Sequence, residues 1–216
     1  MQVLCQTVCN HLVQKGRLQR ERRPFQDIML MVVWILATPD TFRSVALRFG
    51  VRPSTLHYFY SYVIECLREL APQFITWPDA EEREHIKTTG AVGCIDCTHV
   101  YITAPTEDAA QYINRHHSYS LNVQAVVDHN LLVRDLHVGE VGSMQDRRVL
   151  RSPLYQKLLQ RREVLSPDEH LVGDGGYTLT EFVSKMSSFF LCMNIFWFLF
   201  TSFKFLYYCV TDDDTI

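Results

Sequence analysis

The feature that most constrains the fold of this chain is an apolar stretch with a single acid in its middle. Residues 91–103 read AVGCIDCTHVYIT, rich in residues that favour β-strands, with Gly90 before them and Pro105 after them. Asp96 lies among apolar neighbours, where an ionised carboxylate is costly unless it is paired or binds a metal. The strand alone favours an Asp bonded to backbone or arginine over a metal ligand on a rigid sheet.

Composition narrows the class of protein. The chain has 216 residues, 47% hydrophobic and 21% charged, which suits one sizeable domain plus a small one. The net charge of −3 gives no global basic signal, so any DNA contact has to come from local patches. Seven cysteines and no leader-like stretch favour free thiols in a reducing compartment. Cys94 and Cys97 fall on opposite faces of a strand and are expected to be small core residues.

Residues 1–87 are predicted to form a helical N-terminal region. Phe25–Ala37 is apolar nearly all round, which predicts a buried helix that is too short to span a bilayer. Residues 72–78 are expected to be an extended connector. The charged stretch 79–87 is expected to be a solvated helix that leads into the second domain.

Within this region, residues 41–70 suggest a small all-α unit of the helix-turn-helix type. Two helices are expected at 41–50 and 54–70, with a Gly at the end of the first and a Pro near the start of the second. Donors for base edges would lie near the start of the second helix, and we place DNA contacts at Arg52 and Thr55. Arg52 is the single cation there, so a helical hairpin packed on the main domain is an equally weighted alternative.

From residue 88 the pattern changes to strands. The expected order is strand, strand, strand, helix and strand, at residues 91–103, 119–128, 131–138, 149–159 and 171–173. A right-handed crossover then makes the last strand parallel to the first, which is the opening half of a ribonuclease-H-like α/β fold. In such a sheet these two strands are neighbours, so Asp96 and Asp174 are predicted to meet.

Two carboxylates at close range point to a metal site. They repel and are hard to ionise together unless a cation joins them. Hard oxygen ligands select Mg²⁺ or Mn²⁺ rather than zinc. Two such ions, roughly 3.5–4 Å apart, activate a water and stabilise the leaving oxygen of a phosphodiester. The glycines that follow Asp174 would let a nucleic-acid backbone approach closely.

The chain resembles the harbinger transposase-derived nucleases and the PIF/Harbinger DDE transposases over about residues 38–180. The matching blocks are FRSVALRFGVRPSTL (42–56), GCIDCTHVYITAP (93–105), YINRHHSYSLNVQAVVD (112–128), GSMQDRRVLRSPLY (142–155) and LVGDGGYTL (171–179). The resemblance implies a ribonuclease-H-like nuclease core with divalent metal ions, a nuclear setting and a Myb-like DNA-binding partner. By position it implies that Asp96 and Asp174 are catalytic acids. Asp146 matches a recurrent family Asp, either a further metal ligand or a structural carboxylate.

The loop before the second strand contains Arg115, His116 and His117, and DNA contacts are predicted at Arg115 and His116. The competing interpretation of this loop is a plain structural turn. The nuclease core is expected to span residues 88–182 and to be incomplete at its end.

The chain departs from the family pattern at the third acid. The family has a Glu on a later helix, in a block like VERxFGxLK, and this sequence has no such block. Residues 212–214 are three aspartates in no matching context. Residues 187–210 are instead apolar and aromatic, and they are consistent with a membrane tail, a core helix or a non-homologous end. The last interpretation is favoured, with a hydrophobic tail over 183–216.

Two functions of different classes are therefore predicted. The first is a metal-dependent DNA endonuclease, a hydrolase of phosphodiester bonds, weak or inactive because its third acid is missing. The second is a non-catalytic DNA- or protein-binding module that uses residues 41–70. A membrane-anchored protein is a poorer third alternative, and no membrane association is expected.

Overall fold

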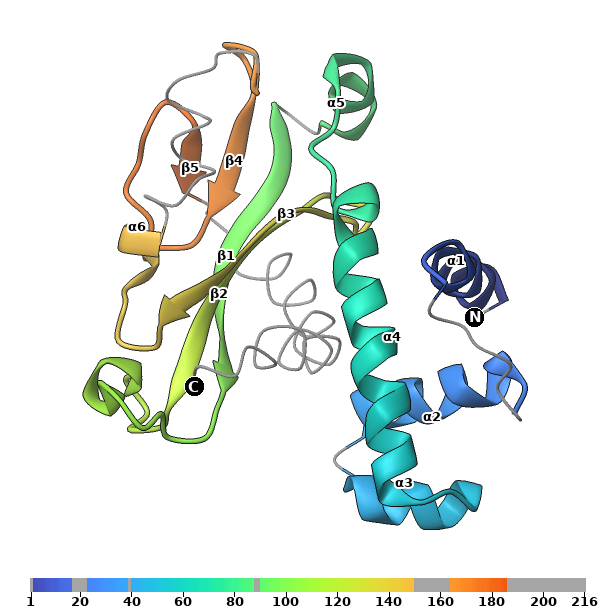
Figure 1. The fold of residues 1–216 in the computed structure, drawn as a ribbon. Helices are drawn as coiled ribbons and strands as arrows, with labels where there is room; N and C mark the ends of the chain where they lie inside the picture. The colour runs from blue at the N-terminus through green and yellow to red at the C-terminus, as the bar shows by residue number, and fades with distance from the viewer. Residues whose placement is uncertain (1, 17–22, 39, 88–89, 150–163, 186–216) are drawn as a thin grey trace. The chain divides into compact units, whose positions relative to one another are not determined.

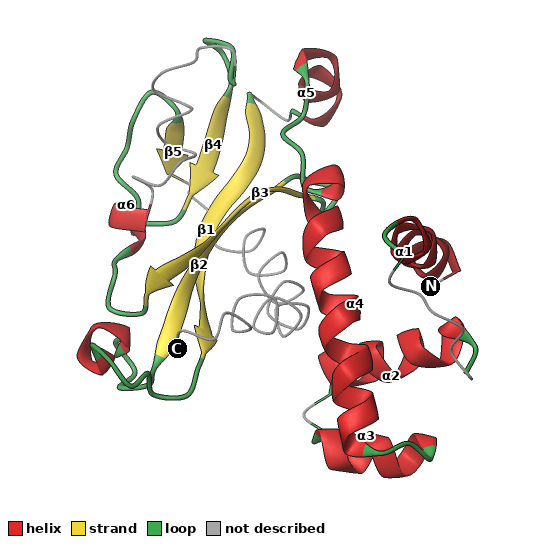
Figure 2. Ribbon diagram, viewed as in Figure 1, coloured by secondary structure: helices red, strands yellow, loops and turns green. Residues whose placement is uncertain are grey.

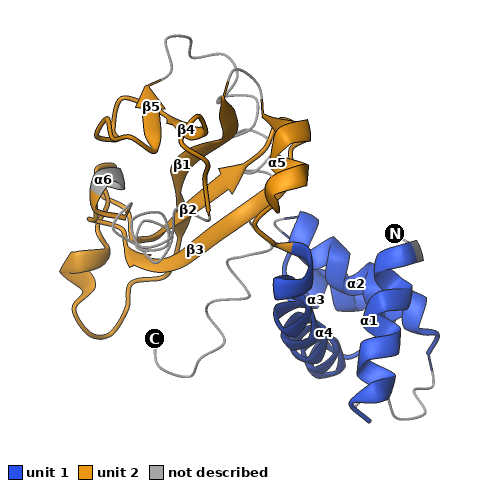
Figure 3. Ribbon diagram, turned by 90° about the horizontal axis from the view of Figure 1, so that it is seen from above, with its two compact units in different colours: residues 1–74, 204–209 blue, residues 75–203, 210–216 orange. Residues whose placement is uncertain are grey.

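The computed structural model describes residues 2–16, 23–38, 40–87, 90–149 and 164–185. The chain divides between Phe74 and Ile75 into two compact units, which Figure 3 colours separately. The first unit contains four helices among its described residues: α1 (Gln2–Gln14), α2 (Phe25–Ala37), α3 (Phe42–Phe49) and α4 (Pro53–Phe74). The second unit is a mixed α/β unit around one sheet (Figure 2).

In the second unit the elements follow one another as the sequence predicted, with some additions (Figure 1). They are α5 (Ala80–Ile86), β1 (Ala91–Tyr101), the 3-10 helix η1 (Ala109–Tyr112), β2 (Ser120–Val127), β3 (Val133–Val141), α6 (Asp146–Val149), β4 (His170–Gly173) and β5 (Val183–Lys185). The helix predicted over 149–159 lies almost entirely outside the described residues.

The core of the first unit is built around α2 and α4. The bounds of α2 are those the sequence predicted, and most of its side chains are buried, as an all-round apolar helix requires. Val8 and Leu12 of α1 are also fully buried. At the rim, His11 Nε2 lies 2.6 Å from Glu69 Oε2, which joins α1 to α4.

The turn between α3 and α4 has a Gly at the end of the first helix and a Pro at the start of the second, as the sequence predicted. The hydroxyl of Thr41 accepts a hydrogen bond from the Ser44 N–H at 3.2 Å and caps the start of α3. Gly50 ends the helix in the left-handed region, at φ 62°, which a residue without Cβ adopts at little cost. Pro53 starts α4 at a position where its missing N–H would be unpaired in any case.

The structure corrects the predicted connector over 72–78, because α4 continues to Phe74. Pro72 lies in the last turn, where its missing N–H removes one helical bond and leaves the earlier turns intact. The two units also divide earlier than the predicted boundary at residue 87, since α5 is bonded to the sheet-bearing unit. Within the described part of the chain, no helix has the length and apolar character needed to cross a bilayer.

The sheet has the strand order β3-β2-β1-β4-β5. β1, β2 and β3 form an antiparallel meander, and β4 is parallel to β1, as the crossover argument predicted. β3 starts two residues later than expected because Asp128 builds the preceding turn. Its Oδ1 accepts hydrogen bonds from the N–H groups of Asn130 (2.8 Å) and Leu132 (3.0 Å).

Sequence reasoning missed β5. Val183–Lys185 is parallel to β4 and extends the sheet by one strand, at the start of the stretch expected to be a tail. Val183 is buried in the core of the second unit together with Ile95, Leu171 and Tyr177. The rest of the predicted tail, 186–216, lies outside the described residues.

Candidate active site

The pairing of β1 with β4 makes the two predicted acids neighbours. Ile95 pairs with Gly173 in the parallel ladder, so Asp96 and Asp174 are the next residues along the two strands. β4 ends at Gly173, and Asp174 opens the loop that follows. Adjacent strands lie about 4.8 Å apart, so the backbones of the two acids are close. This pairing agrees with the predicted meeting of the acids, while their catalytic and metal-binding roles stay predictions.

The carboxylate of Asp96 faces the side of β1 on which β4 lies. Its Oδ1 accepts a hydrogen bond from the N–H of Cys97 at 2.7 Å. The N–H of Ile102 donates to the Tyr119 carbonyl, so the even-numbered positions of this regular ladder bond to the β2 side. The Cys97 N–H therefore points to the β4 side, and so does the carboxylate oxygen that binds it.

The loop that carries Asp174 is fixed against β1 by a tyrosine. The Asp174 Oδ1 accepts a hydrogen bond from the Gly176 N–H at 2.8 Å, which closes a tight turn. Tyr177 is 2% exposed, and its hydroxyl lies 3.3 Å from the Cys97 Sγ. A Cβ on Gly173 would lie 3.0 Å from the Tyr177 ring, so this glycine allows the ring to pack over the strand end. The sequence analysis did not predict a role for Tyr177. The signal that could have indicated one is the position of this aromatic residue directly after the Asp-Gly-Gly turn.

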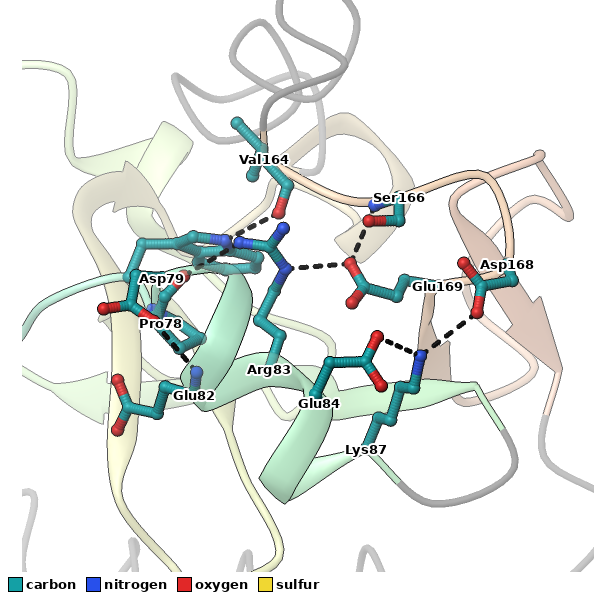
Figure 4. A network of polar contacts seen from close by, with 11 residues as sticks. Pro78, Asp79, Glu82, Arg83, Glu84, Lys87, Val164, Ser166, Asp168 and Glu169 are labelled. Atoms are coloured by element: carbon teal, nitrogen blue, oxygen red, sulfur yellow. Dashed lines mark hydrogen bonds and ion pairs between the residues drawn. The ribbon is translucent and has the colours of Figure 1, made fainter.

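A buried ion pair anchors the segment that enters β4 (Figure 4). Arg83 Nε of α5 lies 2.8 Å from Glu169 Oε2, and the two residues are 5% and 3% exposed. The same carboxylate oxygen accepts a hydrogen bond from the Ser166 N–H at 2.7 Å. Trp77 adds a third link by donating from Nε1 to the Val164 carbonyl at 2.8 Å. The helix predicted to be solvated thus has one face built into the second unit, because its arginine has a buried partner.

A second ion-pair link, between half-buried Lys87 and two exposed carboxylates, lies beside the buried pair (Figure 4). Lys87 Nζ lies 2.6 Å from Glu84 Oε1 and 3.1 Å from Asp168 Oδ2. The hydrogen bond to Glu84, followed by that to Asp168, raises the pKa of Lys87. The same hydrogen bond from Lys87 lowers the pKa of the Asp168 carboxyl. Gly90, at φ 85°, lies next to the backbone of Asp168. A Cβ on Gly90 would come within 2.6 Å of the Asp168 carbonyl oxygen.

The remaining predicted site residues lie elsewhere. Arg52 is exposed just before α4, and Thr55 is half-buried in its first turn, both in the first unit. Arg115 and His116 are exposed in the turn after η1. Asp146 is the first residue of α6, a short helix that contacts β1 and β2. Residues 212–214 lie outside the described part of the chain.

The segment before Asp146 is held by a buried side chain of β2. Asn122 is fully buried, and its Nδ2 donates a hydrogen bond to the Met144 carbonyl at 3.0 Å. Asn122 fixes the backbone that leads into α6. Across the residues that the structure describes, no cluster of three or more His, Cys, Asp or Glu side chains is arranged to hold a metal ion.

Comparisons with known proteins place these observations in a family. Residues 95–190 match the family described as DDE superfamily endonuclease. The Antagonist of Like Heterochromatin Protein 1 of Arabidopsis thaliana is 29% identical over 149 residues, 65% of this chain and 38% of that protein. HARBI1 of Rattus norvegicus, whose name designates it provisionally as a nuclease, is 31% identical over 140 residues, 60% of this chain and 39% of that protein. HARBI1 of Homo sapiens is 30% identical over 139 residues, with the same coverage of 60% and 39%.

The match gives the second unit a likeness to one class of protein. Residues 95–190, less than half of the chain, are similar to the DDE superfamily endonucleases. The relatives confirm the predicted likeness to the harbinger transposase-derived nucleases. The matched part of the chain spans about two fifths of the length of these relatives, 38% and 39%. No solved structure matches the chain.

Proposed function

We propose that this chain is a divalent-metal-dependent DNA endonuclease that hydrolyses phosphodiester bonds at Asp96 and Asp174. The observation that carries the proposal is the pairing of Ile95 with Gly173, which makes the two acids neighbours at the end of β4. The strand order, with β1, β4 and β5 parallel, supports a ribonuclease-H-like architecture for this unit. The family match supports nuclease chemistry.

The donor set fits Mg²⁺ or Mn²⁺. Both ligands are carboxylates, the donors that hard cations prefer. Asp174 uses Oδ1 for its bond to the Gly176 N–H, and within the described part of the chain its Oδ2 remains available to a cation. Bound divalent ions would supply an activated water and stabilise the leaving oxygen.

The chain's own residues hold the two acids in place. The backbone N–H groups of Cys97 and Gly176 each fix one carboxylate oxygen, which limits the rotation of both side chains. Tyr177 locks the loop of Asp174 against β1. A rigid pair of this kind loses little conformational entropy when it binds ions and a phosphodiester.

We further propose that these 216 residues cleave weakly. The sequence has no Glu block of the family type, and the described residues bring no third carboxylate into a metal-binding group. Two carboxylates fix the ions less completely than three. We also propose a nuclear location and a Myb-like DNA-binding protein as partner.

The test is metal-dependent nicking of supercoiled plasmid by the purified chain. Nicking is expected with Mn²⁺ or Mg²⁺, and it should stop with EDTA and in both Asp96→Asn and Asp174→Asn. Asp168→Asn is the matched control, because that carboxylate is exposed and bonded to Lys87. Nicking that persists in both acid variants would refute the proposal.

A second candidate function is DNA binding by the first unit. It is favoured because two arginines of this unit are exposed, whereas two others have contacts within the protein. Arg48 stacks on Trp34, with 4.8 Å between the guanidinium and the ring centre, and Arg23 donates to the Gly50 carbonyl at 3.1 Å. Arg43 and Arg52 are exposed and available to phosphates. Arg52→Gln in the full chain should weaken DNA binding measured in EDTA, and unchanged binding would weigh against this function.

A further inference from the structure

The turn between η1 and β2, residues 114–118, has a fixed shape that one buried side chain imposes. Asn114 is 4% exposed, and its Oδ1 accepts hydrogen bonds from the N–H groups of His116 (2.9 Å) and Ser118 (3.2 Å). Its own N–H donates to the Ser118 carbonyl at 2.9 Å. The turn therefore keeps its conformation without a ligand.

The base of this turn is bonded to the sheet. Asn114 Nδ2 donates to the Ser120 Oγ at 3.0 Å, and that hydroxyl lies 3.1 Å from His99 Nδ1 on β1. Gly142, after β3, packs so closely that a Cβ there would lie 2.4 Å from the Ser120 Oγ. The Ser143 N–H also donates to the Gln111 carbonyl at 3.1 Å. β1, β2 and the segment that follows β3 thus support the turn.

The tip of the turn carries exposed cationic and imidazole groups. Arg115, His116 and His117 are all exposed, and Arg115 Nε donates to His116 Nε2 at 3.3 Å. Among the lysines and arginines of the second unit whose side chains are described, the ones without an ion pair are Arg115, Arg148 and Lys185. Arg83, Lys87 and Arg134 are paired with carboxylates. Within the described residues of this unit, Arg115 is therefore one of three cations that can bind a polyanion without first losing an ion pair.

The turn lies near the carboxyl end of β1, beyond the end of β4 (Figure 1). β1 continues from Asp96 to Tyr101, past the end of β4, over roughly 16 Å at about 3.3 Å per residue. The bridge between Ile113 and Tyr119 brings the turn to this end of the strand. A DNA strand that rises about 3.4 Å per nucleotide covers such a distance in roughly five nucleotides.

We propose that the turn 114–118 binds the sugar–phosphate backbone of double-stranded DNA, with Arg115 on a phosphate roughly five nucleotides from the bond held at Asp96 and Asp174. This inference rests on the proposed nuclease function for its choice of polyanion. Asn114 acts as the positioning residue, because it holds the backbone on which Arg115 is presented.

The test measures binding of a fluorescently labelled 30-base-pair duplex to the full chain by anisotropy, in EDTA, over a series of salt concentrations. Arg115→Gln is expected to bind about eightfold more weakly at 0.1 M salt, with a salt slope smaller by about 0.9, because one phosphate contact is lost. Lys185→Gln is the matched control. It removes an exposed, unpaired cation from the edge strand β5 and should bind as the wild type does.

Asn114→Ala separates the shape of the turn from its charge. This variant keeps every cation, and weaker DNA binding is expected because Arg115 is no longer held in place. Circular dichroism must show a folded variant, and if Asn114→Ala unfolds, Arg115→Gln at the surface decides the question alone. The inference is overturned if Arg115→Gln binds with wild-type affinity and salt slope, or if Lys185→Gln loses as much affinity.

The two proposals fail in distinguishable ways. Asp96→Asn should abolish nicking and keep DNA binding in EDTA, whereas Arg115→Gln should weaken binding in EDTA. If the acid variants stop nicking while Arg115→Gln binds normally, the nuclease function stands and the DNA contact at this turn is wrong. If Arg115→Gln weakens binding while nicking persists in the acid variants, the nuclease site is wrong.

Discussion

Arg83 and Glu169 lie 86 residues apart in sequence, yet their side chains meet at 2.8 Å in the interior of the second unit. Their ion pair joins α5 to the segment that enters β4, and β4 ends beside the predicted acids. The carboxylate also accepts a backbone hydrogen bond from Ser166, so its burial depends on a complete set of partners.

Removing one partner of this pair should destabilise the fold strongly. We expect Arg83→Met to lower the free energy of unfolding by about 3–5 kcal/mol, because the Glu169 carboxylate would stay buried without its cation. Urea unfolding followed by circular dichroism measures the change. Lys87→Met is the matched control, and we expect it to cost much less, because its carboxylate partners stay in contact with water. An Arg83→Met loss no larger than that of the control would contradict the prediction.

Two neighbouring glycines should respond differently to the same substitution. We expect Gly173→Ala to cost about 1–3 kcal/mol, because its Cβ would meet the Tyr177 ring at 3.0 Å and push the loop of Asp174 from β1. Gly175→Ala is the control, since nothing lies within 4 Å of the Cβ it would add. Thermal unfolding of both variants measures the difference. Equal melting temperatures would show that the ring does not pack as described.

Metal binding should be visible without catalysis. If Asp96 and Asp174 hold divalent ions, Mn²⁺ should raise the melting temperature of the wild type, because a ligand that binds the native state stabilises it by mass action. Asp96→Asn and Asp174→Asn should each remove most of this shift, while Asp168→Asn keeps it. A Mn²⁺ shift that survives both substitutions would place the ions elsewhere.

The link between Lys87 and Asp168 should hold across neutral pH and fail in acid. The pKa of the Asp168 carboxyl is lowered from its usual 3.8, so its contribution to stability is present above that pH and is lost as the pH falls through the lower folded value. The pKa of Lys87 is raised from 10.5, so its contribution is lost only as the pH rises beyond that value. The stability difference between wild type and Asp168→Asn should therefore be constant from pH 5 to 9 and shrink below about pH 3.8. Urea midpoints at several pH values measure it, and a difference that grows in acid would have the wrong sign.

Local patterns accounted for much of the fold. The apolar run of α2 and the Gly50 turn were predictable because hydrophobic periodicity and turn residues act over a few positions. The strand order through β4 followed from the rule that such crossovers are right-handed. The helix end before Pro72 was predicted wrongly. A proline in the last turn of a helix destabilises it much less than a proline in the middle. β5 was missed since three residues carry too little periodicity to mark a strand.

The sequence by itself determined where the acids lie along the chain, which strand carries Asp96 and which strand Asp174 follows. Tertiary structure alone decided that Ile95 pairs with Gly173, that Tyr177 closes over that glycine and that Arg83 is buried against Glu169. The physical reason is the separation along the sequence over which each interaction acts. A strand or helix is favoured by neighbours a few residues away, whereas a register, a ring contact or a buried ion pair exists only once distant segments have packed together.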